Sequence, residues 1–365
     1  MPHAVVSDAK IKDAYRAIRA CFGGRGIWAS PFRYAHMCWT RDFVFSLPAL
    51  ARLEHDEPIR RHLLELIRRQ KPTGQIPTWF CDGKIGLMAK KAKRIQHALL
   101  QIPRFRTPAP LSWFGLRRFA ADNELLFAIG LLYWSYASDD ADFLREHQHA
   151  AFRALGYVER ELMKDGLVVG DDWRDANYGP GRRALLSNNC LLYCAYRLRG
   201  ANAKAAELRE RIRAKFLRDG YFVDHPETNA FQLSGNALAI LHGVAEAGEY
   251  NSIFDRAKEL EREFGYASPG VVIPPQNMRE RRLLRRLRER GIAFGVENLF
   301  FVLAELYAGR IDLAMKDIEK LNRLAGFPEC WDAGSGARIG SPDQLWTAAL
   351  YLVAAETLSD AIEAS

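Results

Sequence analysis

The stretch DNELLFAIGLLYWSYASDDADFLREHQHAAFRALGYVERELM, residues 122–163, contains two helix-length segments of opposite character. Residues 125–134 are almost entirely apolar, whereas the segment after Asp140 repeats its apolar residues at three and four, with charged residues between them. That period is typical of an amphipathic helix, and Asp140 is a preferred N-cap residue. The pattern predicts a helical hairpin in which residues 122–138 are buried on nearly all sides and residues 140–163 keep a polar face.

The same helical period recurs along the rest of the chain. Further helices are predicted at residues 8–22, 41–54, 57–70, 183–199, 202–218, 230–247, 250–264, 294–309, 311–325 and 342–361. Caps at Ser7 and Ser341 mark two of the starts, and Gly200 and Gly309 mark two of the ends. Twelve helices without a Ser/Gly-rich linker favour one closed domain over two separate ones. We therefore expect an all-α fold, a single (α/α)6 toroid of six helical hairpins that spans residues 1–365.

Two long insertions interrupt this succession of hairpins. Residues 81–119 are rich in proline, arginine and aromatic residues, and residues 268–290 end in MRERRLLRRLRER. Loops of this length in a compact domain are usually functional or mobile.

The composition is that of an ordinary globular protein. Of 365 residues, 48% are hydrophobic and 26% are charged, and 52 basic against 44 acidic residues give a net charge of +8. These values exclude disordered and collagen-like classes. The N-terminus does not resemble a signal peptide, no apolar stretch could span a bilayer, and the six cysteines lack CxxC spacing. We expect a cytoplasmic protein with reduced thiols.

The segment CWTRDFVFSLPAL, residues 38–50, places Arg41 and Asp42 at the start of a predicted helix. A charged pair there can face a ligand at the mouth of the helix. The alternative is a surface acid that is stabilised by the helix dipole beside an arginine.

The segment VVGDDWRDANYG, residues 168–179, crowds three aspartates around Trp173 and Tyr178. Carboxylates can bind sugar hydroxyls while aromatic faces stack on the sugar ring, and a carboxyl group near apolar rings can have a raised pKa and act as an acid. The alternative is an aspartate-rich turn anchored by Trp173.

The segment GFPECWDAGSGARIGSPDQLWTAALYL, residues 326–352, presents Glu329 in a loop after Pro328. A proline-led turn with solvated acids is the alternative. A glycosidase needs two carboxyl groups that flank the scissile bond, and a closed ring allows Asp175 and Glu329 to meet despite their separation in the sequence.

In this order, the three segments resemble the helical-toroid glycosidases, which include glucoamylases, the glucosidase domain of glycogen-debranching enzymes and neutral/alkaline invertases. WTRD at residues 39–42 resembles their Arg-Asp element, and GQIP at residues 74–77 resembles the turn that follows it. The resemblance implies that Arg41 and Asp42 hold hydroxyls of the sugar before the cleaved bond. Asp122 stands at the position of a further acid of the debranching enzymes.

WRDA at residues 173–176 resembles the WMDA motif of debranching enzymes, which implies that Asp175 is the general acid, with Asp172 as the alternative. FPECWDAGSGARIGSPDQLW resembles the run that carries the catalytic base, which implies this role for Glu329. The residues expected to bind the substrate are Trp39, Arg41, Asp42, Asp122, Asp172, Trp173, Asn189, Trp331, Gln344 and Trp346. In LLSNNCLLY, Asn189 agrees with the debranching pattern PVEINALWY, but Ser187 replaces its glutamate.

The resemblance implies an inverting, exo-acting hydrolase of an α-glucosidic bond in an oligosaccharide, without metal or other cofactor. Two alternatives stay open, namely a sucrose-cleaving invertase-like enzyme and, because of Ser187, an inactive carbohydrate-binding protein. Related helical toroids that epimerise N-acyl sugars use histidine as acid and base, so the scattered histidines leave an epimerase as a further alternative. The arginines of residues 279–290 suit a solvated helix face or a phosphate on a sugar better than a nucleic acid or a membrane, so neither of these partners is expected.

Overall fold

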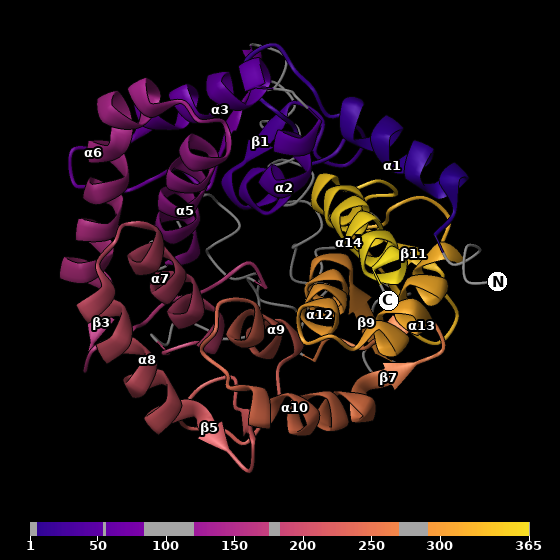
Figure 1. Ribbon diagram of the computed structural model, residues 1–365. Helices are drawn as coiled ribbons and strands as arrows, with labels where there is room; N and C mark the ends of the chain where they lie inside the picture. Colours follow the sequence, from indigo (N-terminus) through magenta and orange to yellow (C-terminus); the bar gives the residue numbers. More distant parts are fainter. Residues whose placement is uncertain (1–5, 54–55, 84–119, 175–182, 270–290, 365) are drawn as a thin grey trace, which may run out of the picture.

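The computed structural model describes residues 6–53, 56–83, 120–174, 183–269 and 291–364. In this part of the chain, six helices form an inner ring (Figure 1). They are α2 (Thr40–Arg52), α5 (Asp122–Ala137), α7 (Leu186–Leu198), α9 (Leu233–Leu241), α12 (Gly295–Tyr307) and α14 (Leu345–Glu363). Each inner helix packs on the next, and α14 packs on α2, so the ring closes.

Six further helices surround this ring (Figure 1). They are α1 (Asp8–Arg19), α3 (Asp56–Arg69), α6 (Ala141–Tyr157), α8 (Asn202–Phe216), α10 (Tyr250–Ala257) and α13 (Ile311–Asn322). The contrast between the rings follows the sequence, because α5 is buried over most of its residues whereas α8 buries only one stripe. The prediction of an all-α toroid and of all twelve helices is confirmed.

The predicted helix starts agree with the structure to within one residue, except that α7, α9 and α14 each begin three residues later than predicted. The hydroxyl of Ser7 and the carboxylate of Asp140 accept from backbone N–H groups of α1 and α6, as N-caps do. Ser341 does not cap α14, which begins at Leu345. Its N–H donates to the Glu329 carboxylate and its hydroxyl bonds to Ser30, so the chain stays non-helical until Gln344.

Short β-hairpins replace the predicted ends of three outer helices. They are β3 (Met163–Lys164) with β4 (Leu167–Val168), β5 (Leu217–Arg218) with β6 (Tyr221–Phe222), and β7 (Glu261–Arg262) with β8 (Gly265–Tyr266). Asp-Gly pairs at residues 165–166 and 219–220 have positive φ at both positions, which is the conformation that tight hairpin turns require.

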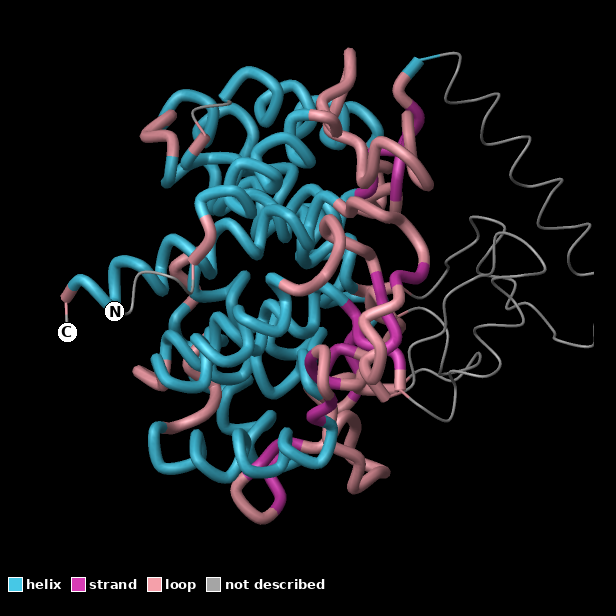
Figure 2. Tube along the Cα trace, turned by 90° about the vertical axis from the view of Figure 1, so that its right-hand side faces the viewer, coloured by secondary structure: helices cyan, strands magenta, loops and turns pink. Residues whose placement is uncertain are grey.

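Two further sheets lie beside the hairpins. In one, β1 (Met37–Trp39) pairs with β2 (Trp79–Cys81), and in the other β10 (Cys330–Asp332) lies between β9 (Ile292–Phe294) and β11 (Arg338–Ile339). Most of these strands gather on one face of the toroid (Figure 2). Every inner helix begins directly after a strand or an isolated bridge, so the N-terminal ends of the inner ring open on this face.

One asparagine in each of three inner helices fixes the preceding hairpin to the ring. The side-chain oxygens of Asn189, Asn236 and Asn298 accept from the N–H of a residue in the second strand of the hairpin, at 2.9, 2.9 and 2.7 Å. The side-chain NH₂ groups donate to the carbonyl of that same residue and to the carbonyl four residues earlier. The three contacts form a structural repeat that holds the strand-bearing face.

We expect Asn236→Ala to lower the free energy of unfolding by about 3 kcal/mol, because it leaves the buried N–H and carbonyl of Phe222 without partners. Urea unfolding monitored by circular dichroism measures this change. Asn251→Ala, at an exposed position of α10, is the matched control and should have little effect. Equal stability of the two variants would contradict the role assigned to the asparagine repeat.

No helix in the described ranges combines the length and the apolar character that crossing a membrane requires. All six cysteines lie in these ranges as free thiols. Apart from residues 81–83 and 268–269, the two predicted insertions lie outside the described residues.

Candidate active site

Buried polar side chains from the first turns of the inner helices collect on the strand-bearing face. Together with side chains from the loops between the helices they form what we call the central polar cluster. Its members are Asp42, Asp122, Glu124, Asp172, Arg174, Ser187, Asp224, Gln232, Ser234, Glu297, Glu329 and Gln344. Burial of so many polar groups costs stability unless each finds a partner, and such a concentration therefore marks a candidate active site.

The carboxylate of Glu329 is held on both oxygens. Oε1 accepts from the Tyr34 hydroxyl at 2.8 Å, and Oε2 accepts from the N–H of Ser341 at 3.0 Å. The guanidinium of Arg33 lies 3.8 Å from Oε2. Burial, with the adjacent Glu329 charge, raises the pKa of Tyr34 well above its usual value, so its hydroxyl stays protonated and donates. Gly340 leaves room for the carboxylate, because a Cβ at this position would collide with it.

Asp42 lies beside Glu329 in the first turn of α2. Its Oδ1 accepts from the side-chain amide of Gln344, which precedes α14. Burial raises the pKa of Asp42 to about 8, and the nearby charge of Glu329 adds to this effect. The two carboxyl groups therefore differ in their environment, and Asp42 holds its proton at neutral pH.

Arg41 and Asp122 form a buried ion pair between α2 and α5. Arg41 Nε lies 3.0 Å from Asp122 Oδ2, and Nη2 donates to Oδ1 at 3.2 Å. The pair locks the two helices together beside Asp42. Two residues further along α5, burial raises the pKa of Glu124 to about 8, although Glu124 accepts from the N–H of Ile76 at 3.1 Å.

Asp172 is paired with Arg174 and is not a free acid. The guanidinium of Arg174 donates to both Asp172 oxygens, and its two bonds to Oδ2 measure 2.9 and 2.6 Å. The Ser187 hydroxyl donates to the same Oδ2 at 2.6 Å. Burial would raise the pKa of Asp172, but the charge and hydrogen bonds of Arg174 outweigh it and lower the pKa. An ionised, paired carboxylate is a poor proton donor. The predicted acid, Asp175, lies outside the described residues.

Three tryptophans border the central polar cluster with unused donors. The indole N–H groups of Trp39, Trp173 and Trp346 are buried, and none finds a hydrogen-bond acceptor among the described residues. Trp173 packs edge-on against Phe45 and Phe300, with ring centroids 5.2 and 6.2 Å apart. A buried indole N–H normally has a hydrogen-bond acceptor. These three have none among the described residues, so a ligand could supply it.

Two other predicted substrate-binding residues use their polar atoms within the protein. The side-chain amide of Asn189 forms hydrogen bonds with the backbone of β4 and with the carbonyl of Leu185. Trp331 is fully buried, and its indole donates to the carbonyl of Phe264 at 2.6 Å. Both residues support the walls of the site in the free protein.

Glu297, in the first turn of α12, belongs to none of the sequence motifs. Its Oε1 accepts from the Gln232 amide at 2.6 Å and from the Ser234 hydroxyl at 3.0 Å, and burial raises its pKa. An acid within the apolar run GVENLFFVLAEL is the signal that could have found it, because a buried acid on an inner helix is costly unless it has a role. No group of three or more His, Cys, Asp or Glu side chains in the described residues could hold a metal ion.

No family model matches the sequence, and no curated protein matches it. Solved structures match over nearly the whole chain. A structure titled "Glycosidase Wild Type" has 16% identity and a TM-score of 0.64, covering 98% of this chain and 97% of its own. A GH63 mannosylglycerate hydrolase from Thermus thermophilus, in complex with glucose, has 14% identity and a TM-score of 0.65, covering 93% of this chain and 98% of its own. At this identity the likeness shows a shared fold, that of these glycosidases.

Proposed function

We propose that the protein is a glycoside hydrolase, and that it cleaves an α-glucosidic bond of an oligosaccharide from the chain end with inversion. The observation that carries this proposal is the buried Glu329 carboxylate, held by Tyr34 and Ser341 beside Asp42, whose pKa burial raises to about 8. The fold shared with glycosidases supports it, as does the motif that presents Asp175.

Glu329 has the properties of a catalytic base. Its two hydrogen bonds fix the carboxylate and still leave lone pairs on both oxygens, which can accept a proton from an attacking water. Asp175 would protonate the leaving oxygen from the other side of the bond, since inverting enzymes place water between the sugar and the base. The buried carboxylates would stabilise the positive charge that develops at the anomeric carbon.

The unused polar atoms of the central polar cluster and its borders suit a sugar. Among the described residues, Gln344 Oε1, Glu124 Oε2 and Asn123 Oδ1 are buried without a hydrogen-bond donor, and the indoles of Trp39 and Trp346 are buried without an acceptor. Sugar hydroxyls both donate and accept hydrogen bonds. The hydroxyls of one sugar could therefore donate to these buried oxygens and accept from these indole N–H groups. Protonated Asp42 would donate to a further hydroxyl.

Release of reducing sugar from a panel of substrates tests the proposal. The panel contains sucrose, maltose, isomaltose, trehalose, a limit dextrin, glucose phosphates and mannosylglycerate, the last because a protein of the same fold is named for it. We expect cleavage of at least one α-glucoside, and about a 10³-fold lower kcat for Asp175→Asn.

Asp165→Asn, in the exposed turn between β3 and β4, is the matched control and should leave kcat unchanged. If a sugar raises the thermal stability of the protein but no substrate is cleaved, the protein is a carbohydrate-binding protein and not a hydrolase. Full activity of Asp175→Asn would remove this residue from the mechanism.

A further inference from the structure

Glu297 and Asp42 occupy equivalent places in the inner ring. Each is the third residue of its helix, Glu297 in α12 and Asp42 in α2. Each accepts a hydrogen bond from the side-chain amide of a glutamine that directly precedes an inner helix, Gln232 before α9 and Gln344 before α14. In both cases that helix is the preceding neighbour in the ring (Figure 1). We call the two arrangements the Glu297 pair and the Asp42 pair.

The buried Glu297 carboxyl group points to the inside of the ring. Its partner Gln232 precedes α9, the neighbour of α12. Burial raises the pKa of Glu297, and the charges of Arg174 and Asp172, which precede α7, respectively lower and raise it further. A side chain of α12 that interacts with segments preceding both α9 and α7 lies on the inner side of its helix.

Each pair leaves one buried oxygen without a hydrogen-bond donor. Glu297 Oε1 accepts from the Gln232 amide at 2.6 Å and lies 3.0 Å from the Ser234 hydroxyl, and Ser268 also interacts with the carboxyl group and lowers its pKa. Glu297 Oε2 has no hydrogen-bond partner among the described residues, and in the Asp42 pair the same is true of Gln344 Oε1. A hydroxyl group of a ligand would supply the donor that each oxygen lacks.

An aromatic layer connects the two pairs. Phe45 and Phe300 lie three residues after Asp42 and Glu297, a spacing that puts each ring on the same face of its helix as the carboxyl group. The two rings pack edge-on with centroids 4.9 Å apart, and Trp173 packs on both. This contact joins α2 to α12, although α14 separates the two helices in the ring (Figure 1). The two pairs therefore border the same space, on the strand-bearing side of the aromatic layer.

The Glu297 pair is fixed in the protein without a ligand. Gln232 Oε1 accepts from the N–H of Gly235 at 2.5 Å, which directs the NH₂ group of the same amide toward Glu297. An apolar floor with a few fixed polar groups at its border is typical of a site that binds one small molecule in a single orientation.

We propose that Glu297 binds a hydroxyl of the same sugar ring that Asp42 contacts, and that it thereby selects the sugar. The inference rests on the proposed function, in which this ring is the sugar before the cleaved bond. The two pairs would hold hydroxyls on two sides of the ring while its apolar face rests on the aromatic layer. The site therefore selects a sugar with a free hydroxyl at Glu297, because an analogue without it leaves a buried polar group unpaired.

Binding of glucose and of 2-, 3-, 4- and 6-deoxyglucose to Glu297→Met tests this role. Methionine has nearly the volume of glutamate but cannot form its hydrogen bonds. In wild type we expect one of the deoxy sugars to lose about tenfold or more in affinity through Glu297, and in Glu297→Met this loss should shrink to less than about threefold. The losses for the other deoxy sugars should persist. Isothermal titration calorimetry measures each dissociation constant.

The matched control is Glu305→Met, which replaces an equally buried acid of α12 two turns further along the helix. It should leave every ratio between glucose and a deoxy sugar unchanged. With the best substrate of the panel, KM should rise about tenfold in Glu297→Met while kcat changes less than about threefold, as for uniform binding. If Glu297→Met does not fold, Glu297→Gln replaces it, because glutamine still accepts from Gln232, and the loss for the same deoxy sugar should again shrink.

Unchanged deoxy-sugar ratios and an unchanged KM in the folded Glu297 variant would overturn the inference and leave the hydrolase intact. Equal effects of Glu297→Met and Glu305→Met would also overturn it, because they would indicate a general disturbance of α12. A wild-type protein that neither cleaves a sugar of the panel nor binds glucose would overturn the proposed function, and the role of Glu297 with it.

Discussion

Glu329→Gln is expected to lower kcat for glycoside cleavage by about 10³-fold or more, because glutamine cannot accept a proton from the attacking water. The variant should fold, since the Tyr34 hydroxyl can still donate to the amide oxygen and the space beside Gly340 is unchanged. KM should change little, because the amide retains the shape of the carboxylate. Initial rates with the best substrate of the panel measure both constants.

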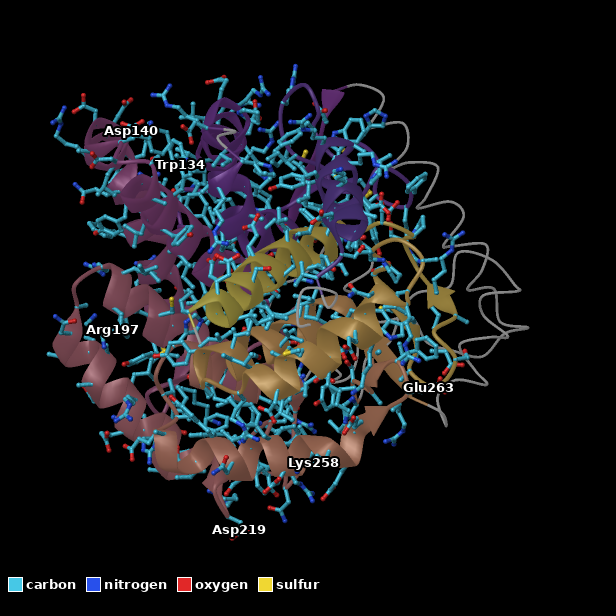
Figure 3. All side chains as sticks on the ribbon, turned by 45° about the vertical axis from the view of Figure 1, so that its right-hand side comes forward. Trp134, Asp140, Arg197, Asp219, Lys258 and Glu263 are labelled. Carbon is cyan, nitrogen blue, oxygen red and sulfur yellow. The ribbon has the colours of Figure 1, made fainter. Side chains whose placement is uncertain are left out.

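The matched control for this prediction is Glu263→Gln. Glu263 lies in the exposed turn between β7 and β8 (Figure 3), so its replacement makes the same chemical change away from the central polar cluster. We expect wild-type kcat for this control. An active Glu329→Gln protein would show that another group serves as the base, and Glu297 would then be tested by the same substitution.

Asp42→Asn is expected to stabilise the protein at pH 8. The pKa of Asp42 rises from an ordinary value of 3.8 to about 8 in the folded chain. A raised pKa means that the stabilising contribution of the protonated form is complete below pH 3.8 and is lost progressively up to pH 8. About four pH units at about 1.4 kcal/mol each set an upper value of about 6 kcal/mol for this loss.

Asparagine carries no charge and still accepts from the Gln344 amide, so the variant avoids the loss. Urea unfolding at pH 4 and pH 8 measures the effect, which should be small at pH 4 and on the order of 2–5 kcal/mol at pH 8. Exposed Asp312→Asn, on α13, is the control and should show no such dependence. A destabilised Asp42→Asn protein at pH 8 would contradict the buried, protonated state assigned to Asp42.

The helical fold could be predicted because the spacing of the apolar residues in each segment shows which faces of its helix are buried. Residues 125–134 are apolar on all sides and form α5 of the inner ring, as expected. The hairpins were missed because strands of two residues are too short to display a period, and Leu217 and Arg218 continue the helical pattern of α8. The prediction that Ser341 caps α14 was wrong because of a tertiary contact that no local pattern shows: the N–H of Ser341 donates to the Glu329 carboxylate.

The candidate site could be predicted only where one short segment carries it. The motifs around Asp42 and Glu329 single out residues that the fold brings together, with Gln344 between α14 and α2. Glu297 lay in no such motif. The contact of Arg174 with Asp224 spans 50 residues, and no local pattern announces such a pair.

The stereochemistry of the first product tests the inverting mechanism most directly. Proton NMR during cleavage of the best α-glucoside records which anomer of glucose appears before mutarotation equalises the two forms. We expect the β-anomer first, as a water activated by Glu329 on the face opposite the leaving group requires. The α-anomer first would contradict a base-activated water and would make a carboxylate of the site a covalent nucleophile.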